Sequence, residues 1–302
     1  MIHLAYCADR VMSPSLHVSL FSVLTHARDK VRLWLYLEGY SSREIDRLKC
    51  TILNARPDAE VGFIQLDLGV FKAFRPFYGS YLPYARLLLP EVIPAERFLY
   101  LDADTLCTAD CRFLMDLDLG DSIVGMRSEG PVSSVRDRDL LIASGMSEDD
   151  LAYNSGVIVF DGRKWREESV GERILEFGRK NSAYLFTADQ VCLNAVLKGR
   201  IAPLAYSWNE CVHPVGSGER GQETALLGRS AIYHFLGNPK PWDIGAFLFS
   251  PGWPLFARYV SRSRTWDEVA RHYIRRDSVE RAWRLRRNYS AAWKGSFSKK
   301  PS

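Results

Sequence analysis

Two aspartates that follow a short apolar run carry the strongest chemical signal in the chain. Residues 98–101 are Phe-Leu-Tyr-Leu, and Asp102, Ala103 and Asp104 come directly after them. If the strand continues, alternation places the two carboxylates on the same side. Carboxylates this close repel each other unless a cation lies between them, and oxygen ligands suit Mg²⁺ or Mn²⁺. A pair of solvated loop aspartates is the alternative interpretation.

A second polar segment begins at His234, which follows an apolar run. Gly237 comes three residues later, and Lys240 stands between two prolines. This pattern predicts a stiff loop, in which His234 completes a metal site and Lys240 neutralises phosphate. The alternative interpretation is an ordinary core or surface histidine, which is the more common role of a lone histidine.

Three further motifs are weak when taken singly. Asn154-Ser155-Gly156 directly precedes a predicted strand, and Asp189-Gln190 lies on a predicted helix. Each is typical of a cap or a turn. Arg86 lies on a predicted amphipathic helix, where a solvated charge is the simplest interpretation.

The elements that position these residues alternate between strand and helix. Apolar periodicity predicts strands at 2–7, 31–37, 61–66, 97–101, 122–126 and 157–160, and helices at 16–25, 41–53, 80–89, 164–180 and 187–197. This alternation indicates an α/β fold with a mainly parallel sheet and helices on both faces. Ligands of such sheets bind beyond the carboxyl ends of the strands, where the polar motifs are found.

The composition is that of a globular protein, with 47% hydrophobic and 25% charged residues. No apolar run approaches the roughly 20 residues that span a bilayer, and the first residues lack the basic flank of a signal peptide. The six cysteines are scattered, which predicts reduced thiols. We therefore expect a cytoplasmic protein.

Charge divides the chain into residues 1–260, a domain with net charge −4, and residues 261–302, a segment with net charge +8. The basic segment contains the apolar and aromatic residues Trp266, Val269, Tyr273, Ile274, Trp283, Leu285, Tyr289 and Trp293. Such a mixture suits an anionic membrane surface. A terminal helix packed on the domain and a nucleic-acid contact are the alternatives. We expect deletion after Ser261 to weaken liposome binding and to leave donor hydrolysis largely intact.

Taken together and in order, the motifs resemble those of the family 8 glycosyltransferases, which include bacterial galactosyl- and glucosyltransferases of lipopolysaccharide assembly. The resemblance extends from Ile2 to Trp242. It implies a GT-A fold, in which a Rossmann-like nucleotide half and an acceptor half form one domain. It also implies a UDP-sugar donor, Mn²⁺ or Mg²⁺, a glycan or lipid-linked saccharide acceptor, no nucleic acid, and retention of anomeric configuration.

The resemblance assigns roles to particular residues. The metal ligands it implies are Asp102, Asp104 and His234. The nucleotide-sugar contacts it implies are Cys7, Ala8, Asp9, Arg86, Asp102, Ala103, Asp104, Gly237 and Lys240. Asn154, Asp189 and Gln190 match positions around the transferred sugar, and the resemblance therefore implies that they are the catalytic residues.

Two positions depart from the family pattern. The family often carries an Asn-Tyr pair after its first aspartates, with the tyrosine stacked on uracil, whereas Met12 stands here. Where a family member has an aspartate against the sugar hydroxyls, the nearest acidic residue here is Glu129.

The resemblance leaves two mechanisms open. A double displacement needs a nucleophile below the anomeric carbon, and the amide oxygen of Gln190 is a poor one. Same-face attack is therefore favoured, with the departing phosphate oxygen accepting the proton from the acceptor. Gln190 and the Asn154 carbonyl then stabilise an oxocarbenium-like transition state.

Three other functions fit parts of the sequence. Phosphohydrolases of the haloacid dehalogenase type also place Asp-X-Asp after a strand, but they need Thr or Val where Leu106 stands. A non-catalytic sugar-binding or assembly protein is a second rival. A self-glycosylating primer similar to glycogenin is a third, within the same family. The sequence does not identify the donor sugar, the acceptor, the linkage or the oligomeric state.

Overall fold

The computed structural model describes residues 1–214, 231–248, 250–284 and 290. The strands are β1 (Ile2–Asp9), β2 (Val31–Glu38), β3 (Glu60–Phe63), β4 (Arg97–Leu101), β5 (Thr105–Cys107), β6 (Val124–Pro131), β7 (Leu151–Asp161), β8 (Ile201–Leu204), β9 (Glu210–Val212) and β10 (Ile232–Phe235). The α-helices are α1 (Ser13–His26), α2 (Ser42–Ala55), α3 (Leu89–Val92), α4 (Arg112–Met115), α5 (Arg138–Ala143), α6 (Gly162–Glu167), α7 (Val170–Lys180), α8 (Asp189–Val196), α9 (Trp253–Ser263), α10 (Trp266–Tyr273) and α11 (Arg276–Arg284).

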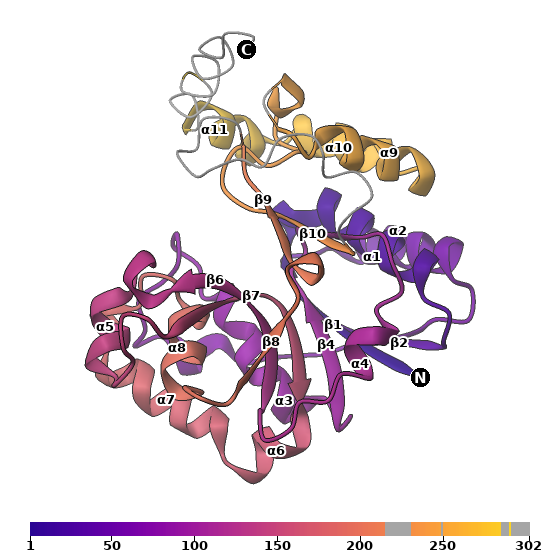
Figure 1. Ribbon diagram of the computed structural model, residues 1–302. Helices are drawn as coiled ribbons and strands as arrows, with labels where there is room; N and C mark the ends of the chain where they lie inside the picture. The colour runs from indigo at the N-terminus through magenta and orange to yellow at the C-terminus, as the bar shows by residue number, and fades with distance from the viewer. Residues whose placement is uncertain (215–230, 249, 285–289, 291–302) are drawn as a thin grey trace, which may run out of the picture.

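Seven strands form the central sheet, in the order β3-β2-β1-β4-β7-β6-β8 (Figure 1). Strand β7 runs antiparallel to both of its neighbours, and every other pair in this sheet is parallel. The predicted mainly parallel sheet is therefore confirmed. A second sheet, β5-β10-β9, joins the chain that leaves β4 to the C-terminal part of the protein.

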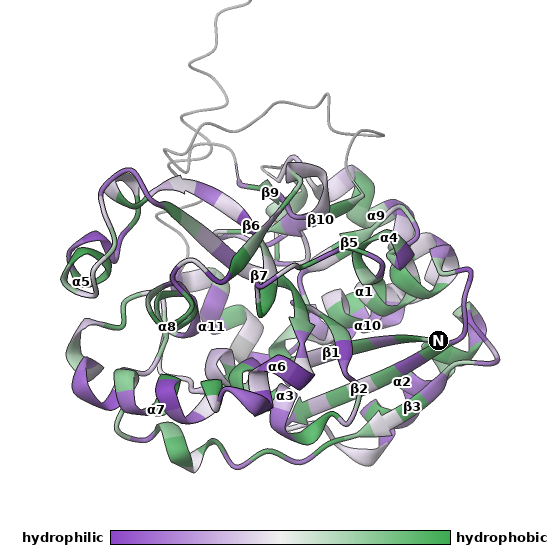
Figure 2. Ribbon diagram, turned by 60° about the horizontal axis from the view of Figure 1, so that its bottom comes forward, coloured by the Kyte–Doolittle hydropathy of each residue, from purple (hydrophilic) through white to green (hydrophobic). Residues whose placement is uncertain are grey.

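Side chains of the central sheet alternate between two apolar cores. Phe98 and Tyr100 of β4 pack with residues of α3, α6, α7 and α8 on one face. Leu99 and Leu101 pack with residues of α1 and α2 on the other. Hydrophobic residues line the inner strands, whereas α7 alternates hydrophilic and hydrophobic residues (Figure 2). Both faces of the sheet are covered, as a mainly parallel sheet requires.

The C-terminal helices build a third core against the body of the protein. Phe256 and Tyr259 of α9 pack with Phe235 of β10, with Trp242 and with Val18 of α1. Figure 1 shows α9 and α10 beside α1 and α2. These helices therefore belong to the folded body. Within the described part of the chain, no helix combines the length and the apolar character that a membrane span needs.

Several predicted elements have different bounds in the structure. The helix expected at 80–89 is a 3-10 helix (Leu82–Leu88) that continues directly into α3. Pro90 does not end the helical segment, because it lies in the first turn of α3, where proline is tolerated. The helix expected at 164–180 is divided into α6 and α7 at Ser169, whose φ is +49°. Strand β7 begins six residues before its predicted start, so Asn154-Ser155-Gly156 lies inside a strand. The apolar run at 157–160 marks only part of that strand.

Candidate active site

Asp102 and Asp104 lie in a turn between two strands rather than in one continuing strand. Strand β4 ends at Leu101, and the Thr105 N–H donates to the Asp102 carbonyl at 3.1 Å. The expected strand alternation therefore does not apply. The antiparallel pairing of β5 with β10 sets Thr105 opposite His234, which brings the histidine beside the aspartates.

One ligand atom from each of Asp102, Asp104 and His234 lies within 4.8 Å of the other two. His234 Nε2 is 3.1 Å from Asp104 Oδ1 and 3.6 Å from Asp102 Oδ2. Lys240 Nζ is 2.7 Å from Asp104 Oδ2. Burial raises the pKa of Asp104, but Lys240 and His234 outweigh it and hold this pKa well below its usual range. Two carboxylates and an imidazole on one spot fit Mn²⁺ or Mg²⁺ by ligand type.

Arg86 is buried beneath this cluster, so a solvated helix charge is the wrong interpretation. Its side chain is 9% exposed, and its Nη2 lies 2.9 Å from Asp102 Oδ1. Its Nε lies 3.2 Å from Asp189 Oδ2, and its Nη1 donates to the Ser155 carbonyl at 2.6 Å. The Tyr100 hydroxyl donates to Asp102 Oδ1 at 2.6 Å. The side chain of Asp102 is therefore held by two neighbours.

Amide and carboxyl groups from three elements meet beside Asp102. Asn154 Nδ2 donates to Glu129 Oε1 at 2.7 Å, and Gln190 Nε2 donates to Glu129 Oε2 at 2.8 Å. Asp189, next to Gln190 at the start of α8, is buried. Burial raises the pKa of Asp189 to about 6, although Arg86 opposes the shift. The structure thus places Asn154, Asp189 and Gln190 together, and adds Glu129 to them.

The end of β1 supplies the residues assigned to the nucleotide. Cys7 and Ala8 are buried in the strand, and Asp9 Oδ1 accepts the Met12 N–H at 3.1 Å. Burial is the largest influence on Asp9 and raises its pKa. Met12 is half-buried and packs against two of the apolar cores.

The loop after β10 carries Gly237 and Lys240. Gly237 has φ +69°, a conformation that favours glycine. The Lys240 N–H donates to Asp243 Oδ2 at 2.8 Å. Arg281 of α11 binds both oxygens of Asp243, at 2.9 and 3.1 Å, and donates to Asn238 Oδ1. A side chain from the basic C-terminal segment therefore fastens the loop that carries Lys240.

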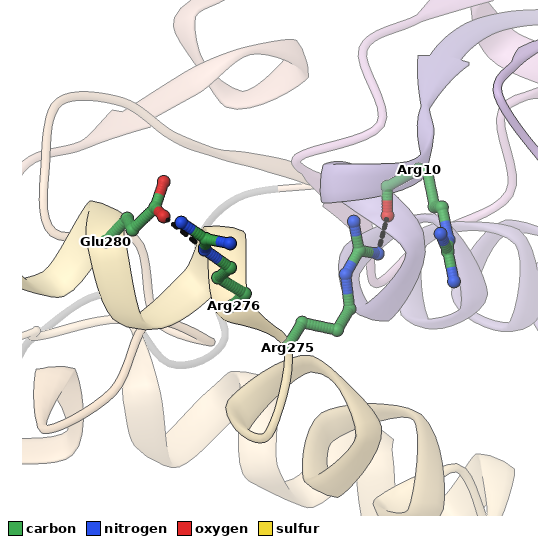
Figure 3. Close-up of a pocket in the computed structure, with 4 residues that line it drawn as sticks. All are labelled: Arg10, Arg275, Arg276 and Glu280. Carbon is green, nitrogen blue, oxygen red and sulfur yellow. Dashed lines mark hydrogen bonds and ion pairs between the residues drawn. The ribbon is translucent and has the colours of Figure 1, made fainter.

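The C-terminal segment also reaches the end of β1. A cavity of about 500 Å³ is lined by Arg10, Arg275, Arg276 and Glu280. Figure 3 shows the Arg275 guanidinium donating to the Arg10 carbonyl and Arg276 paired with Glu280. The basic segment thus lies against the residues that follow Asp9. Leu285, Tyr289 and Trp293, also named from the sequence, lie outside the described residues.

Sequence reasoning missed two residues that act on this region, Asn209 and Arg281. Asn209 is fully buried and bonds to His234 and Asn154. Arg281 is one of nine arginines in the basic segment. Neither lies in a motif, so no local signal distinguishes either from a turn or a surface residue.

A mainly parallel sheet with the aspartate turn beyond β4 has the architecture of a GT-A transferase. Residues 3–245 match the family described as glycosyl transferase family 8, so the chain belongs to that family. The galactosyltransferase LgtC, solved with donor and acceptor sugar analogues, superposes with a TM-score of 0.72 at 23% identity, covering 86% of this chain and 96% of LgtC. That likeness concerns the fold, and the family match indicates a glycosyltransferase.

Two curated relatives match most of the chain, and one of them is named a glycosyltransferase. General stress protein A of Bacillus subtilis is 26% identical over 260 residues, covering 80% of this chain and 88% of that protein. The glycosyltransferase GlyF of Streptococcus pneumoniae is 24% identical over 268 residues, covering 87% of this chain and 62% of GlyF. The chain thus spans most of the first relative and less than two thirds of the second.

Proposed function

We propose that this protein is a retaining, metal-dependent hexosyltransferase. It transfers a hexose from a UDP-sugar to a hydroxyl of a glycan or glycolipid acceptor of the cell-envelope type. The observation that carries the proposal is the cluster of Asp102, Asp104 and His234. Lys240 pairs with Asp104. Asn209 links His234 to Asn154, which shares the Glu129 carboxylate with Gln190. The metal, the donor and the acceptor class are parts of the proposal.

Asp102, Asp104 and His234 would hold Mn²⁺ or Mg²⁺. Such a cation, when bound, supplies Lewis-acid stabilisation of the negative charge on a departing diphosphate. Lys240 adds a fixed positive charge to the same region, where preorganised charge lowers a barrier most effectively. Arg86 contributes by fixing the orientation of Asp102 through its 2.9 Å ion pair.

The remaining assigned residues surround the donor. Cys7, Ala8 and Asp9 line the nucleotide at the end of β1, and Ala103 and the Gly237 backbone lie against the diphosphate. Gln190 and Asn154 stabilise the positive charge that develops on the sugar. Glu129 orients both amides by accepting from their NH₂ groups. The acceptor oxygen attacks on the face that the diphosphate leaves, and a phosphate oxygen accepts its proton.

Calorimetric titration of UDP into the protein, with Mn²⁺ and then with EDTA, tests the proposal. We expect binding that requires the metal and that Asp104→Ala abolishes. The matched control is Asp149→Asn, which changes an exposed carboxylate in the turn before β7 and should bind like the unmodified protein. Equal binding with Mn²⁺ and with EDTA would contradict the metal site, and no UDP binding at all would contradict the nucleotide.

Self-glycosylation is the alternative within the same family. It predicts that the protein gains the mass of a hexose when it is incubated with UDP-sugar and metal but no acceptor. Mass spectrometry of the intact chain distinguishes this alternative from transfer to a separate glycan.

A peripheral membrane location is the second part of the proposal. Ile274, Val279 and Trp283 on and beside α11 are each more than half exposed, and Arg275, Arg276 and Arg284 lie among them. Exposed apolar side chains flanked by arginines suit the interface of an anionic membrane. A lipid-linked acceptor would be presented on such a surface.

Vesicle sedimentation tests this location. The double variant Ile274→Ser, Trp283→Ser should bind more weakly than the unmodified chain to vesicles containing anionic lipid. The control, Phe113→Ser, removes an exposed aromatic side chain from α4. Unchanged binding of the double variant would contradict the membrane contact.

A further inference from the structure

Three buried hydrogen bonds connect Gly156 to His234 through the side chains of Asn154 and Asn209. The first of these side chains, Asn154, can adopt only one amide orientation. The Gly156 N–H donates to Asn154 Oδ1 at 2.9 Å. At the other end of the same side chain, Asn154 Nδ2 faces a Glu129 oxygen at 2.7 Å. A backbone N–H can only donate and an ionised carboxylate can only accept. The Asn154 amide therefore has one orientation, with its oxygen toward Gly156.

Asn209 continues the chain from Asn154 to the histidine. Its Nδ2 lies 2.8 Å from Asn154 Oδ1, and its Oδ1 lies 3.0 Å from His234 Nδ1. Because Asn154 Oδ1 accepts, Asn209 must present its NH₂ group there. Its oxygen consequently faces the imidazole, and that oxygen can only accept.

The direction of these bonds determines which nitrogen of His234 carries the proton. Nδ1 must donate to Asn209 Oδ1, so Nε2 is the nitrogen whose lone pair can bind a cation. Nε2 is the nitrogen that faces Asp104 and Asp102. A histidine ligand whose other nitrogen donates to an oxygen has both its tautomer and its ring orientation fixed.

Packing holds the ring on a second side. A Cβ built on Gly156 would lie 2.0 Å from His234 Cε1, so the imidazole occupies the space that a side chain would fill. His234 and Asn209 are both almost completely buried, which excludes bulk water as a substitute partner for Nδ1. The Asn-Ser-Gly motif thus supports the histidine through Asn154 and through Gly156.

We propose that Asn209 is a positioning residue for the metal site. It fixes the Nδ1–H tautomer of His234 and directs Nε2 toward Asp102 and Asp104. The inference rests on the proposed function, because His234 is taken there as a metal ligand. It also links that ligand to the sugar side of the site, since Gln190 and Asn154 donate to the same Glu129 carboxylate.

The test compares Asn209→Leu with Asn209→Asp in metal titration without nucleotide. Mn²⁺ binding is followed by the electron paramagnetic resonance signal of the free ion. We expect Asn209→Leu to weaken Mn²⁺ binding by about 10- to 100-fold, the range for the loss of such a partner. Asn209→Asp loses the donor to Asn154 Oδ1 but keeps an acceptor for Nδ1–H, so it should weaken Mn²⁺ binding less than Asn209→Leu does. The control Thr51→Val removes a buried hydroxyl that bonds to His17, away from the site.

A second measurement does not depend on activity or on Mn²⁺. Long-range ¹H–¹⁵N spectra of histidine-labelled protein at pH 8 with Mg²⁺ report the tautomer, and His234→Gln identifies the signal. We expect the proton on Nδ1 in the unmodified chain and a shift toward the Nε2–H form in Asn209→Leu. A proton on Nε2 or on both nitrogens of the unmodified chain would overturn the proposal. If the unmodified chain binds Mn²⁺, an unchanged affinity in Asn209→Leu would overturn it as well.

These outcomes separate the two proposals. If the unmodified chain binds no Mn²⁺ but its tautomer changes in Asn209→Leu, the positioning role stands and the metal part of the proposed function fails. If the unmodified chain binds Mn²⁺ and both Asn209 variants bind it as tightly as the unmodified chain does, the proposed function stands and the role of Asn209 is refuted.

Discussion

The two halves of the metal site are held in place by different means. Asp102 and Asp104 follow β4, a strand paired on both sides within the central sheet, and Asp102 is bound by buried Arg86. His234 and Lys240 come from β10 and the loop after it, which belong to a small three-stranded sheet. Side chains from distant segments hold this second half, namely Asn209 before β9 and Arg281 on α11.

This difference determines whether a substitution lowers the stability of the fold or only the affinity for a ligand. The aspartate half follows a strand that packs in both cores of the central sheet and is paired with buried Arg86, so a change there affects folding and function together. The histidine half depends on a few side-chain hydrogen bonds, so a change there can weaken binding while the fold survives. Substitutions in the two halves should therefore separate stability from ligand affinity.

The largest effect is expected from Arg86→Met. Removing the guanidinium leaves the Asp102 and Asp189 carboxylates without their buried partner. Breaking one side of a buried ion pair costs about 3–5 kcal/mol of stability. Urea unfolding measures this loss, and UDP binding in the presence of Mn²⁺ should disappear with it.

Two variants control for this substitution. Arg86→Lys should recover little, because a lysine cannot reproduce the several contacts of a planar guanidinium. Arg112→Met removes an arginine that is half-exposed and paired with Asp29 and Asp116, and it should leave the stability almost unchanged, because exposed ion pairs contribute little. Equal losses for Arg86→Met and Arg112→Met would contradict the central role of Arg86.

The second effect concerns pH and the contact between the body and the C-terminal helices. His17 of α1 bonds to Thr51 and lies 3.9 Å from Glu268 of α10, which also pairs with Arg47 of α2. Burial lowers the pKa of His17 to about 4, although Glu268 opposes the shift. The unfolded chain therefore binds this proton more readily than the folded chain does.

The stability linked to His17 is complete above pH 6.5 and is lost as the pH falls toward 4. The loss amounts to about 3 kcal/mol over this interval. Urea unfolding at pH 7.5 and at pH 4.5 measures it, and His17→Gln should reduce the difference. The same pH dependence in His17→Gln would assign the effect to other groups.

The smallest effect is expected from Arg281→Met, which releases the loop that carries Lys240. We expect the KM for the donor to rise by about 10-fold, the order of one charged hydrogen bond, with little change in thermal stability. The matched control on the same helix is Arg276→Met, because Arg276 is exposed and pairs with Glu280 one turn along the helix. A similar rise in KM for both variants would contradict the loop contact.

The contacts of Arg281 also revise one expectation from the sequence. Deletion after Ser261 was expected to leave donor hydrolysis intact, but α10 packs in the third core and α11 bonds to Asp243. The deleted chain should therefore lose donor hydrolysis as well as vesicle binding. A truncated protein with full hydrolysis would restore the earlier expectation.

The sheet elements were predictable because their signals are local. Apolar runs located β1, β2 and β4, and apolar periodicity located α2, which begins at a capping box of Ser41 and Glu44. The start of β7 and the break at Ser169 were not predictable. The first lies in residues of mixed polarity, and the second depends on a left-handed backbone conformation that serine rarely adopts.

The sequence by itself determined which chemical groups are present and in what order: the aspartate pair after β4, the histidine and lysine near residue 240, and the amides between them. Only the tertiary structure decided how they are oriented. Asn209 is 25 residues from His234, and Lys240 is 136 from Asp104. A hydrogen bond over such separations leaves no periodicity in the chain, because it is formed by the pairing of β5, β9 and β10 and by the docking of α11, not by neighbours in sequence.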